Sequence, residues 1–420
     1  MANYELRIAQ SMTEVPREDW DGIVSGAASP LLSWGLLALL EESGSICPET
    51  GWTPAHFLLR ENSGGRLVAA APFYGRGDSW GEFVYDMEFA RAAQRAGLRW
   101  YPKLVGMVPA TPAPAWRVLV APDMDEEYLT GIVLDAASEA ARRSGMGGVH
   151  VLWPAPEAAA LIRKRKETID NSSSRPSPRA GKGKEASPRA AWAEWSHQAF
   201  LWTDEGFGDF SGWLGSFSKN MRRNVLRERA ALREAGVESR VIRAEEAAAT
   251  PGLLGLMAEL YESHNDKFGP WAAKFLTQDF FLRLPEFLPS GWALSTGLRG
   301  GEPIALAFLF EGGDRIYGRY YGALEEVPNL HFELCYYRPV EYALERGIAS
   351  FDPGMGSPHK ARRGFRSGLA PSFHRLFDPR LADFVASVLP EFNEAEAAEV
   401  AALNGELPYK AVGQARSRTL

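Results

Sequence analysis

The stretch HFLLRENSGGRLVAAAPFYGRGDSWGEFVYD, residues 56–86, decides the fold, because WALSTGLRGGEPIALAFLFEGGDRIYGRYYG at 292–322 repeats its pattern at an offset of 236. The aligned identities are Leu58/Leu294, Gly64/Gly300, Gly65/Gly301, Ala69/Ala305, Ala71/Ala307, Gly77/Gly313 and Asp78/Asp314. Each copy alternates apolar runs with Gly-Gly and Gly-Asp turns, which is typical of hairpins. The repeat therefore predicts the same three-stranded meander at two places in the chain.

A second pair of segments supports a duplication. ARRSGMGGVHVLWP at 141–154 and ALERGIASFDPGM at 343–355 each combine a helix end, a glycine just after it and an extended run. Two unrelated βαβ pieces are the alternative interpretation. We favour an α/β (α+β) protein built from two tandem copies of one domain, the first at 1–162 and the second, the active one, at 193–410, followed by a flexible tail at 411–420.

The two copies are separated by a basic segment rich in Ser and Pro. Residues 163–189 carry nine basic and three acidic side chains, a net charge of +6, which leaves −13 for the rest of the chain. So few large apolar side chains cannot offset the entropy of ordering the segment. We expect 163–192 to be a disordered insertion, either simply solvated or acting as a phosphate-binding arm. The alternating run HQAFLWTD at 197–204 predicts the strand that follows.

Composition limits the classes of function. The chain has 420 residues, 45 % hydrophobic and 24 % charged, close to the globular average. A net charge of −7 excludes a general DNA-coating protein, so we expect no DNA partner. Cys47 and Cys335 lack the spacing of disulfide frameworks or metal ligands, which favours the cytoplasm. The apolar run at 31–40 is too short to span a bilayer, so we expect no transmembrane segment.

The segment at 216–237 predicts a helix with a basic face. Ser218 can cap its start and Gly236 its end. Lys219, Arg223 and Arg227 are spaced four residues apart and therefore share one face. A solvated charged surface is one interpretation, and a surface that meets an anionic polymer is the other.

Two polar clusters in the second copy are the candidate site. Arg319 and Tyr320 end an aromatic strand, and a helix predicted at 330–346 carries His331 and Glu333 in its first turn, where free N–H groups favour an anion. The alternative for His331 and Glu333 is simple helix capping. The seven histidines form neither a metal cluster nor a Ser-His-Asp order, so we expect no metal.

The second cluster is a glycine-rich loop just beyond the strand that ends at Asp352. It reads FDPGMGSPHKARRGF at 351–365 and contains His359, Lys360, Arg362 and Arg363. Ligands of α/β proteins collect at the carboxyl ends of strands. Four residues that can carry positive charge within five positions suit a phosphate or a carboxylate.

These residues carry a resemblance to a known family. The ordered strings ETGWTPAHF (49–57), WGEFVYD (80–86), WYPKL (100–104), HFELCYY (331–337) and HKARRGF (359–365) resemble the bacterial peptidoglycan biosynthesis/recognition family, also called FemAB-like. That family is a branch of the Gcn5-related N-acyltransferase (GNAT) superfamily. The resemblance implies tandem GNAT-like domains and transfer of an acyl or aminoacyl group to an amine. Ser357-Pro358 departs from the Gly-Glu that is common in the family.

The resemblance also implies co-substrates and residue roles. The donor would be aminoacyl-tRNA, acyl-CoA or an acyl carrier protein, the acceptor a small-molecule or peptide amine, and no cofactor would be covalently bound. We expect His331, Glu333 or His359 to be the base and Tyr320 to donate a proton to the leaving group. Substrate phosphates would be bound by Lys360, Arg362, Arg363, Arg319, Arg223 and Arg227. A non-catalytic module that recognises cell-wall precursors is the alternative function.

One string that fits an acetyltransferase motif is better explained as a helix end. Residues 142–147, RRSGMG, match the R-x-x-G-x-G pattern that holds the pyrophosphate of acetyl-CoA at the start of a helix. Here the string closes a predicted helix and leads into the strand VHVLW. We therefore expect Gly145 and Gly147 to form a C-cap and a turn.

Overall fold

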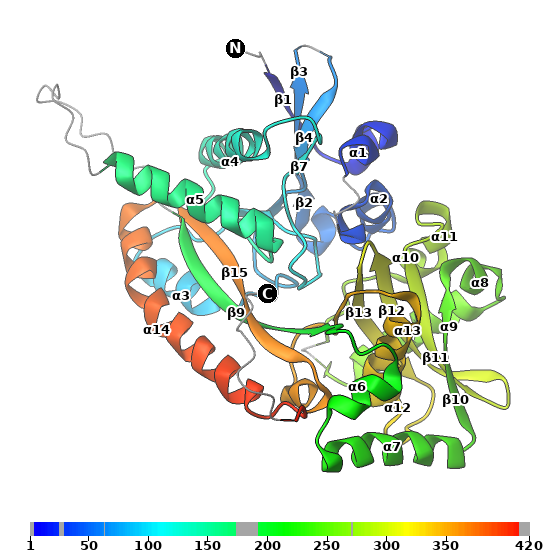
Figure 1. Cartoon of the computed structure of the whole chain (residues 1–420). Coiled ribbons are helices and arrows are strands. Elements are labelled where there is room, and N and C mark those ends of the chain that lie inside the picture. Colours follow the sequence, from blue (N-terminus) through cyan, green and yellow to red (C-terminus); the bar gives the residue numbers. More distant parts are fainter. Residues whose placement is uncertain (1–3, 25–28, 63, 174–191, 270–271, 411–420) are drawn as a thin grey trace, which may run out of the picture.

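The structure is a computed structural model that describes residues 4–24, 29–62, 64–173, 192–269 and 272–410, with side chains of 166–173 left undescribed. Two α/β domains lie on either side of a pair of long strands (Figure 1). In the described part of the chain, no helix is both long and apolar enough to cross a bilayer.

The first domain contains the elements of the amino-terminal half of the chain. Its strands are β1 (Tyr4–Ala9), β2 (Trp52–Pro54), β3 (His56–Glu61), β4 (Leu67–Ala71), β5 (Tyr74–Arg76), β6 (Lys103–Gly106), β7 (Leu119–Val120) and β8 (Gly148–Val151). Its helices are α1 (Arg17–Ile23), α2 (Trp34–Glu42), α3 (Met87–Arg95), α4 (Glu126–Arg143) and α5 (Pro156–Ser173), with short 3₁₀ turns at Met12–Glu14, Pro30–Leu32 and Pro48–Thr50.

The second domain contains the remaining elements. Its strands are β9 (Ala193–Thr203), β10 (Val237–Arg243), β11 (Trp292–Arg299), β12 (Glu302–Gly312), β13 (Arg315–Ala323), β14 (Ser350–Asp352) and β15 (Arg366–Leu376). Its helices are α6 (Phe210–Ser216), α7 (Lys219–Glu234), α8 (Ala244–Ala249), α9 (Leu253–Asp266), α10 (Gln278–Leu282), α11 (Leu284–Phe287), α12 (Leu330–Phe332), a π-helical turn η5 (Glu333–Tyr337), α13 (Arg338–Arg346), a 3₁₀ turn η6 (Pro358–Arg363) and α14 (Pro379–Asn404).

The strand order shows two related halves around a shared centre. One sheet has the order β1-β3-β4-β7, and the other β10-β11-β12-β13-β14-β9-β15-β8-β6-β5-β2. In each half a helix crosses between parallel strands, as β6-α4-β8 and as β13-α12/α13-β14. β8 then pairs with β15 and β14 with β9, and β9 and β15 pair with each other. Both halves therefore contain a helix crossover between parallel strands, and the tandem duplication itself stays a prediction.

The predicted equivalence of the two meanders is right for two strands and wrong for the third. β3-β4 and β11-β12 are both antiparallel hairpins, although Leu58 pairs with Ala70 while Leu294 pairs with Phe308. This register differs by two residues, which keeps every side chain on its face. β13 pairs with β12, whereas β5 pairs with β2 and β6. A Pro-Phe step after β4 turns the first-domain chain into the other sheet.

The helix predicted at 216–237 is present but shorter, from Lys219 to Glu234, with Ser218 at its N-cap position and no side-chain capping bond there. The basic helix is α7, with Val225 and Leu232 buried on its apolar face and Gly236 in the left-handed conformation just after it. α4 ends at Arg143 and Gly145 has a φ of +67°, so the string RRSGMG is a helix end rather than a phosphate loop.

The predicted disordered insertion at 163–192 begins too early. α5 continues to Ser173, and the Arg163 side chain pairs with Glu194 at 2.6 Å. The run of Arg, Lys and Glu after 163 has high helix propensity, so the helix extends through it. Residues 174–191 of the expected insertion and the tail 411–420 lie outside the described residues, while Trp192, predicted to be part of the insertion, is buried. The domain boundaries themselves stay predictions.

Candidate functional site

The candidate site lies where two parallel strands of the second domain separate. β14 pairs with β13 only from Arg315/Ser350 to Tyr317/Asp352. Beyond that point β13 continues to Ala323, while the segment that follows β14 turns away at Pro353. β13 also contains an extra residue there, because Phe308 pairs with Tyr320 and Leu309 with Gly318, which leaves Arg319 in a bulge.

The gap between the separated strands is a cavity of about 510 Å³. This volume is within the range of pockets that hold small ligands. Its walls come from both domains: Phe83, Ala110 and Pro112 from the first, and Tyr261, His264, Phe268, Phe275, Phe308, Arg319, Tyr320, Tyr321, His331, Cys335, Tyr336, Met355, Ser357, His359 and Lys360 among those from the second.

Lys360 is a buried cation at the end of this cavity. Its Nζ donates hydrogen bonds of 2.7 Å to the carbonyl oxygens of both Gly354 and Met355. The residue is only 3 % exposed, and among the described residues no carboxylate lies within ion-pair distance. Burial lowers the pKa of Lys360 to about 8. A buried charge without an ion-pair partner is typical of a site that meets an anion or a developing negative charge.

Arg319 and Asp352 form a pair beside it. The Arg319 Nη1 and Asp352 Oδ1 atoms are 3.3 Å apart, and both side chains are buried. Asp352 Oδ1 also accepts a hydrogen bond from the backbone N–H of Gly354. The hydrogen bond to Gly354 positions the loop after β14. Because the Arg319–Asp352 pair is neutral overall, most of the net charge at this end of the cavity is on Lys360.

The two expected histidines face the same cavity, with ring centroids 6.1 Å apart. His359 is held on both sides: Nε2 lies 2.9 Å from the Tyr336 hydroxyl and Nδ1 lies 2.7 Å from Ser357 Oγ. Within the described chain, the His331 ring makes ring contacts, such as that with Tyr321, and no hydrogen bond. Burial lowers the pKa of each histidine to about 4. Both are therefore neutral at pH 7, and His331 is the one free to accept a proton.

Tyr320 also lines the cavity, with its ring edge against Tyr261 at 5.0 Å between centroids. Burial raises the pKa of the Tyr320 hydroxyl, so it keeps its proton at neutral pH and can donate a hydrogen bond. Lys360, His331, His359, Arg319 and Tyr320 thus converge on one cleft, as the sequence predicted.

Glu333 does not join them, and the prediction of a carboxylate base at this position is wrong. Its carboxylate accepts hydrogen bonds from Arg229 and from Ser239, away from the cavity. Residues two apart on a helix point to different faces, so His331 and Glu333 diverge. Cys335, four residues after His331, lies on the cavity side instead.

Two of the expected anion-binding arginines also point elsewhere. Arg362 is exposed and pairs with Glu406 at 2.9 Å. The Arg363 guanidinium stacks over the Phe332 ring at 3.3 Å and lies 3.5 Å from Glu228. The dense phosphate site expected from four cationic positions is therefore not formed. Arg223 and Arg227 are exposed on α7 and do not line the cavity.

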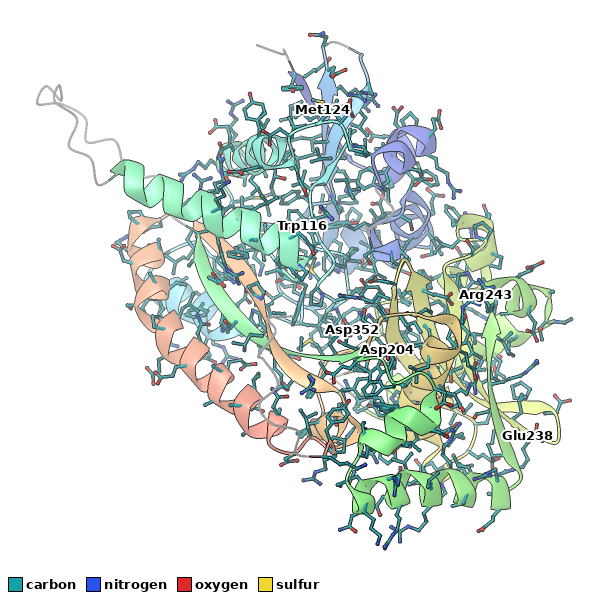
Figure 2. The ribbon with its side chains drawn as sticks, in the orientation of Figure 1. Trp116, Met124, Asp204, Glu238, Arg243 and Asp352 are labelled. Atoms are coloured by element: carbon teal, nitrogen blue, oxygen red, sulfur yellow. The ribbon has the colours of Figure 1, made fainter. Side chains whose placement is uncertain are left out.

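The corresponding place in the first domain is filled by aromatic rings. β6 and β8 pair in parallel only as far as Gly106/Val151, and the chain then crosses to β7, which pairs with β4. The rings of Phe73 and Trp116 pack so closely on Gly106 that a Cβ there would lie 2.8 Å from either. Figure 2 labels Trp116 in the first domain and Asp352 in the second. Phe73 and Trp116 thus occupy the space beside Gly106, the position that corresponds to the cavity of the second domain.

Sequence reasoning missed the walls of the cavity. Phe83 lies in the string WGEFVYD that carried the family resemblance, but its role depends on contact with the second domain. Cys335 and Tyr336 stand in the string HFELCYY and could have been found from their spacing of four and five after His331. His264, on α9, is preceded by no motif at all.

The strand order and the cleft between separated parallel strands define a protein of the tandem GNAT-like class. The FemAB-like family, described as peptidoglycan biosynthesis/recognition, matches residues 11–411, and the chain belongs to this family. The resemblance inferred from the sequence is therefore confirmed.

Solved structures with a similar fold are distant in sequence. The C-terminal domain (DUF2156) of a protein assigned as a lysylphosphatidylglycerol synthetase from Agrobacterium fabrum matches with a TM-score of 0.51 at 12 % identity, covering 90 % of this chain and 97 % of that one. FemX matches at 0.48 and 14 %, covering 91 % and 100 %. A tandem GNAT protein from the clavulanic acid biosynthesis pathway matches at 0.42 and 12 %, covering 89 % and 98 %. No curated protein matches the chain significantly.

Proposed function

We propose that this protein is an N-acyltransferase that moves an acyl or aminoacyl group from an activated ester or thioester to an amine of a cell-wall or lipid precursor. The observation that carries the proposal is the buried, unpaired Lys360 ammonium beside neutral His331, at the separation of β13 and β14. Such a pair can stabilise an oxyanion and accept a proton in one cleft.

The reaction needs no nucleophile from the protein. The amine nitrogen attacks the carbonyl carbon, a C–N bond forms, and the carbonyl oxygen gains negative charge. The third N–H of Lys360 donates to that oxygen, because its other two are bonded to backbone carbonyls. His331 accepts a proton from the attacking nitrogen, and Tyr320 donates a proton to the leaving oxygen or sulfur as the C–O or C–S bond breaks.

Aminoacyl-tRNA, acyl-CoA and an acyl carrier protein are the donor classes that fit this chemistry. Arg223 and Arg227, exposed on α7, would favour a donor with a phosphate backbone. All these donors occur in the cytoplasm, which is where we place the reaction. The test is a matrix of the full chain with each donor class and with amine acceptors from cell-wall precursors and aminolipids, read by the mass gained by the acceptor. Donor binding without product for any acceptor would overturn the proposal in favour of a binding module.

His331→Gln is expected to lower kcat by about 10²-fold or more while leaving KM for the donor within a few-fold, because the proton acceptor is lost and the cavity keeps its shape. Since the pKa of His331 is lowered to about 4, wild-type kcat should not titrate with this group between pH 5.5 and 7. Steady-state kinetics over that range provide the measurement.

The control for His331 is His359→Gln. Both nitrogens of His359 are already engaged with Tyr336 and Ser357, so this variant should lose less than about 10-fold in kcat. A larger loss for His359→Gln than for His331→Gln would reverse the two assignments.

A further inference from the structure

The cavity is lined mainly by aromatic and aliphatic side chains, together with uncharged polar side chains such as Asn265, Tyr321 and Ser357. Among the described residues that line it, Arg319 and Lys360 are those that are charged at neutral pH, and Arg319 is neutralised by Asp352. The three lining histidines have lowered pKa values, caused mainly by burial, and are neutral. The other lining residues include the aromatic and aliphatic side chains of Phe83, Ala110, Pro112, Tyr261, Phe268, Phe275 and Phe308. A pyrophosphate would meet little positive charge here, whereas an apolar group would contact mainly aromatic and aliphatic side chains.

The first domain supplies part of this apolar wall from strained backbone. Phe83 and Ala110 line the cavity with φ angles of +58° and +51°, and Ser357 lines it with +71°. Such angles are costly for residues other than glycine and persist only where surrounding contacts impose them. Three strained residues around one cavity indicate that the shape of its wall is maintained at a cost in stability.

Phe83 is held by a buried neighbour and by a ring contact with the second domain. Its neighbour Glu82 is fully buried between Lys103 Nζ at 2.6 Å and Arg76 Nε at 3.4 Å. The Phe83 ring packs edge-on against Phe275 at 5.6 Å between centroids. The strings WGEFVYD and WYPKL therefore build an ion cluster that fixes one aromatic ring of the cavity wall.

Phe275 is fixed from the second domain. The Tyr261 hydroxyl accepts hydrogen bonds from the backbone N–H groups of Phe275 and Leu276 and donates one to the carbonyl of Ala273. A Cβ at Gly81 would lie 2.9 Å from the Phe275 ring, so the two domains meet closely at this point. Phe83 and Phe275 thus form a part of the cavity wall to which both domains contribute.

We propose that the transferred group is a bulky apolar acyl group, a fatty acyl chain or an apolar aminoacyl side chain, that occupies this cavity, and that Phe83 and Phe275 limit its length. The inference rests on the proposed function for the transfer step and adds the class of the donor. The carbonyl lies at the Lys360 end and the apolar part extends toward the first domain. The first domain, which contributes Phe83 to the cavity wall, acts as a specificity element for the second.

The experiment uses the full chain and acyl thioesters of N-acetylcysteamine, with hydroxylamine as the amine. Acetyl, octanoyl, dodecanoyl and phenylalanyl thioesters are compared by kcat/KM and, without the amine, by calorimetric binding. Octanoyl or phenylalanyl thioester should be preferred over acetyl by about 10-fold or more, since each buried methylene adds to discrimination. Which of the two is faster distinguishes a fatty acyl donor from an aminoacyl donor.

The variant is Phe83→Ala, with Tyr85→Ala as its matched control. Tyr85 lies on the same segment but is 69 % exposed and does not line the cavity. Phe83→Ala should raise the dodecanoyl-to-octanoyl ratio of kcat/KM at least about 5-fold, while Tyr85→Ala leaves it unchanged. If Phe83→Ala fails to fold, Phe83→Trp should shift the preference toward the shorter chain.

The two proposals fail in different ways. Tight binding of octanoyl or phenylalanyl thioester without transfer would overturn the proposed function and support the apolar cavity. Transfer with a preference for acetyl, or equal effects of the variants at 83 and 85, would overturn the cavity inference and leave the function standing. Binding of none of the thioesters would also overturn the cavity inference.

Discussion

Lys360→Met is expected to lower kcat for acyl transfer by about 10²–10³-fold, the scale observed when one oxyanion donor is removed. The methionine side chain has a similar length but neither charge nor donor, so the developing negative charge on the carbonyl oxygen would face an apolar wall. The measurement is steady-state kinetics with the best donor, together with thermal unfolding to show that the variant is folded. Arg362→Ala is the control, because Arg362 is exposed, pairs with Glu406 and should change kcat less than about 2-fold.

Lys360→Gln separates the charge from the anchoring of the loop. Its amide can still donate to the carbonyls of Gly354 and Met355 but carries no charge, so its kcat should be as low as that of the methionine variant. Recovery of activity in this variant would show that Lys360 only anchors the loop at 353–357, and would contradict the role in catalysis.

The pH profile gives an independent check on Lys360. Its pKa is lowered to about 8, so the ammonium is present below pH 8 and is lost as the pH rises through that value. We expect wild-type kcat to fall above pH 8 and the fall to be absent from Lys360→Gln. In the unfolded chain the Lys360 ammonium keeps its proton up to about pH 10.4. As the pH rises from 8 to that value, the native state therefore gains stability relative to the unfolded state, while activity falls.

Much of the fold could be predicted from the sequence because the residues that end helices and form turns act locally. Gly236 and Gly347 follow helices in the left-handed conformation, and Gly300 and Gly301 turn between two strands. Each of these positions needs a residue that tolerates positive φ, so the element ends were readable without tertiary information. The third strand of the first meander was not, because whether β5 continues its sheet or joins another is decided by packing far away in the chain.

The candidate site was predicted in part for the same reason. His359 and Lys360 follow the end of β14, and a loop at that position necessarily lies near the neighbouring strand. The prediction that Arg362 and Arg363 bind substrate phosphates relied on the density of positive charge in the loop. Adjacent side chains on a short 3₁₀ turn point in different directions, and these two arginines pair with Glu406 and Glu228. The cavity wall at Phe83 depends on contact with Phe275, nearly two hundred positions later in the chain, and hydrophobic periodicity carries no information on such contacts.

Lys103→Met is expected to destabilise the protein by about 3–5 kcal/mol, the usual cost of removing one partner from a buried ion cluster. The Lys103 Nζ lies 2.6 Å from both Glu82 and Asp86, and each of the three side chains is at most 1 % exposed. With Arg76 the buried part of the cluster has two cations and two anions, and Arg76 also pairs at 2.8 Å with Asp78, which is exposed. Loss of Lys103 leaves two carboxylates facing one guanidinium, with no access to water. Urea unfolding at pH 8 gives the measurement.

The stability lost in Lys103→Met should depend on pH, because the pKa of Glu82 is raised. Burial raises the pKa of Glu82 to about 7 even with Lys103 present. In Lys103→Met its pKa rises further, so the carboxyl is protonated and neutral at pH 5.5 and charged only at higher pH. The variant should therefore be less destabilised at pH 5.5 than at pH 8. A loss below about 1 kcal/mol at pH 8, or one that does not depend on pH, would contradict this account of the cluster.

A double substitution connects the cluster to the cavity. Lys103→Met with Glu82→Gln removes one charge of each sign, so it should be less destabilising than the sum of the two single changes. Arg91→Ala is the control: it breaks an exposed ion pair with Glu88 and should destabilise the protein by under about 0.5 kcal/mol. Because Glu82 holds Phe83 in its strained backbone, the double variant, once folded, should also accept longer acyl groups. Stability and selectivity would then change together through one buried cluster, as expected if the first domain exists to shape the site of the second.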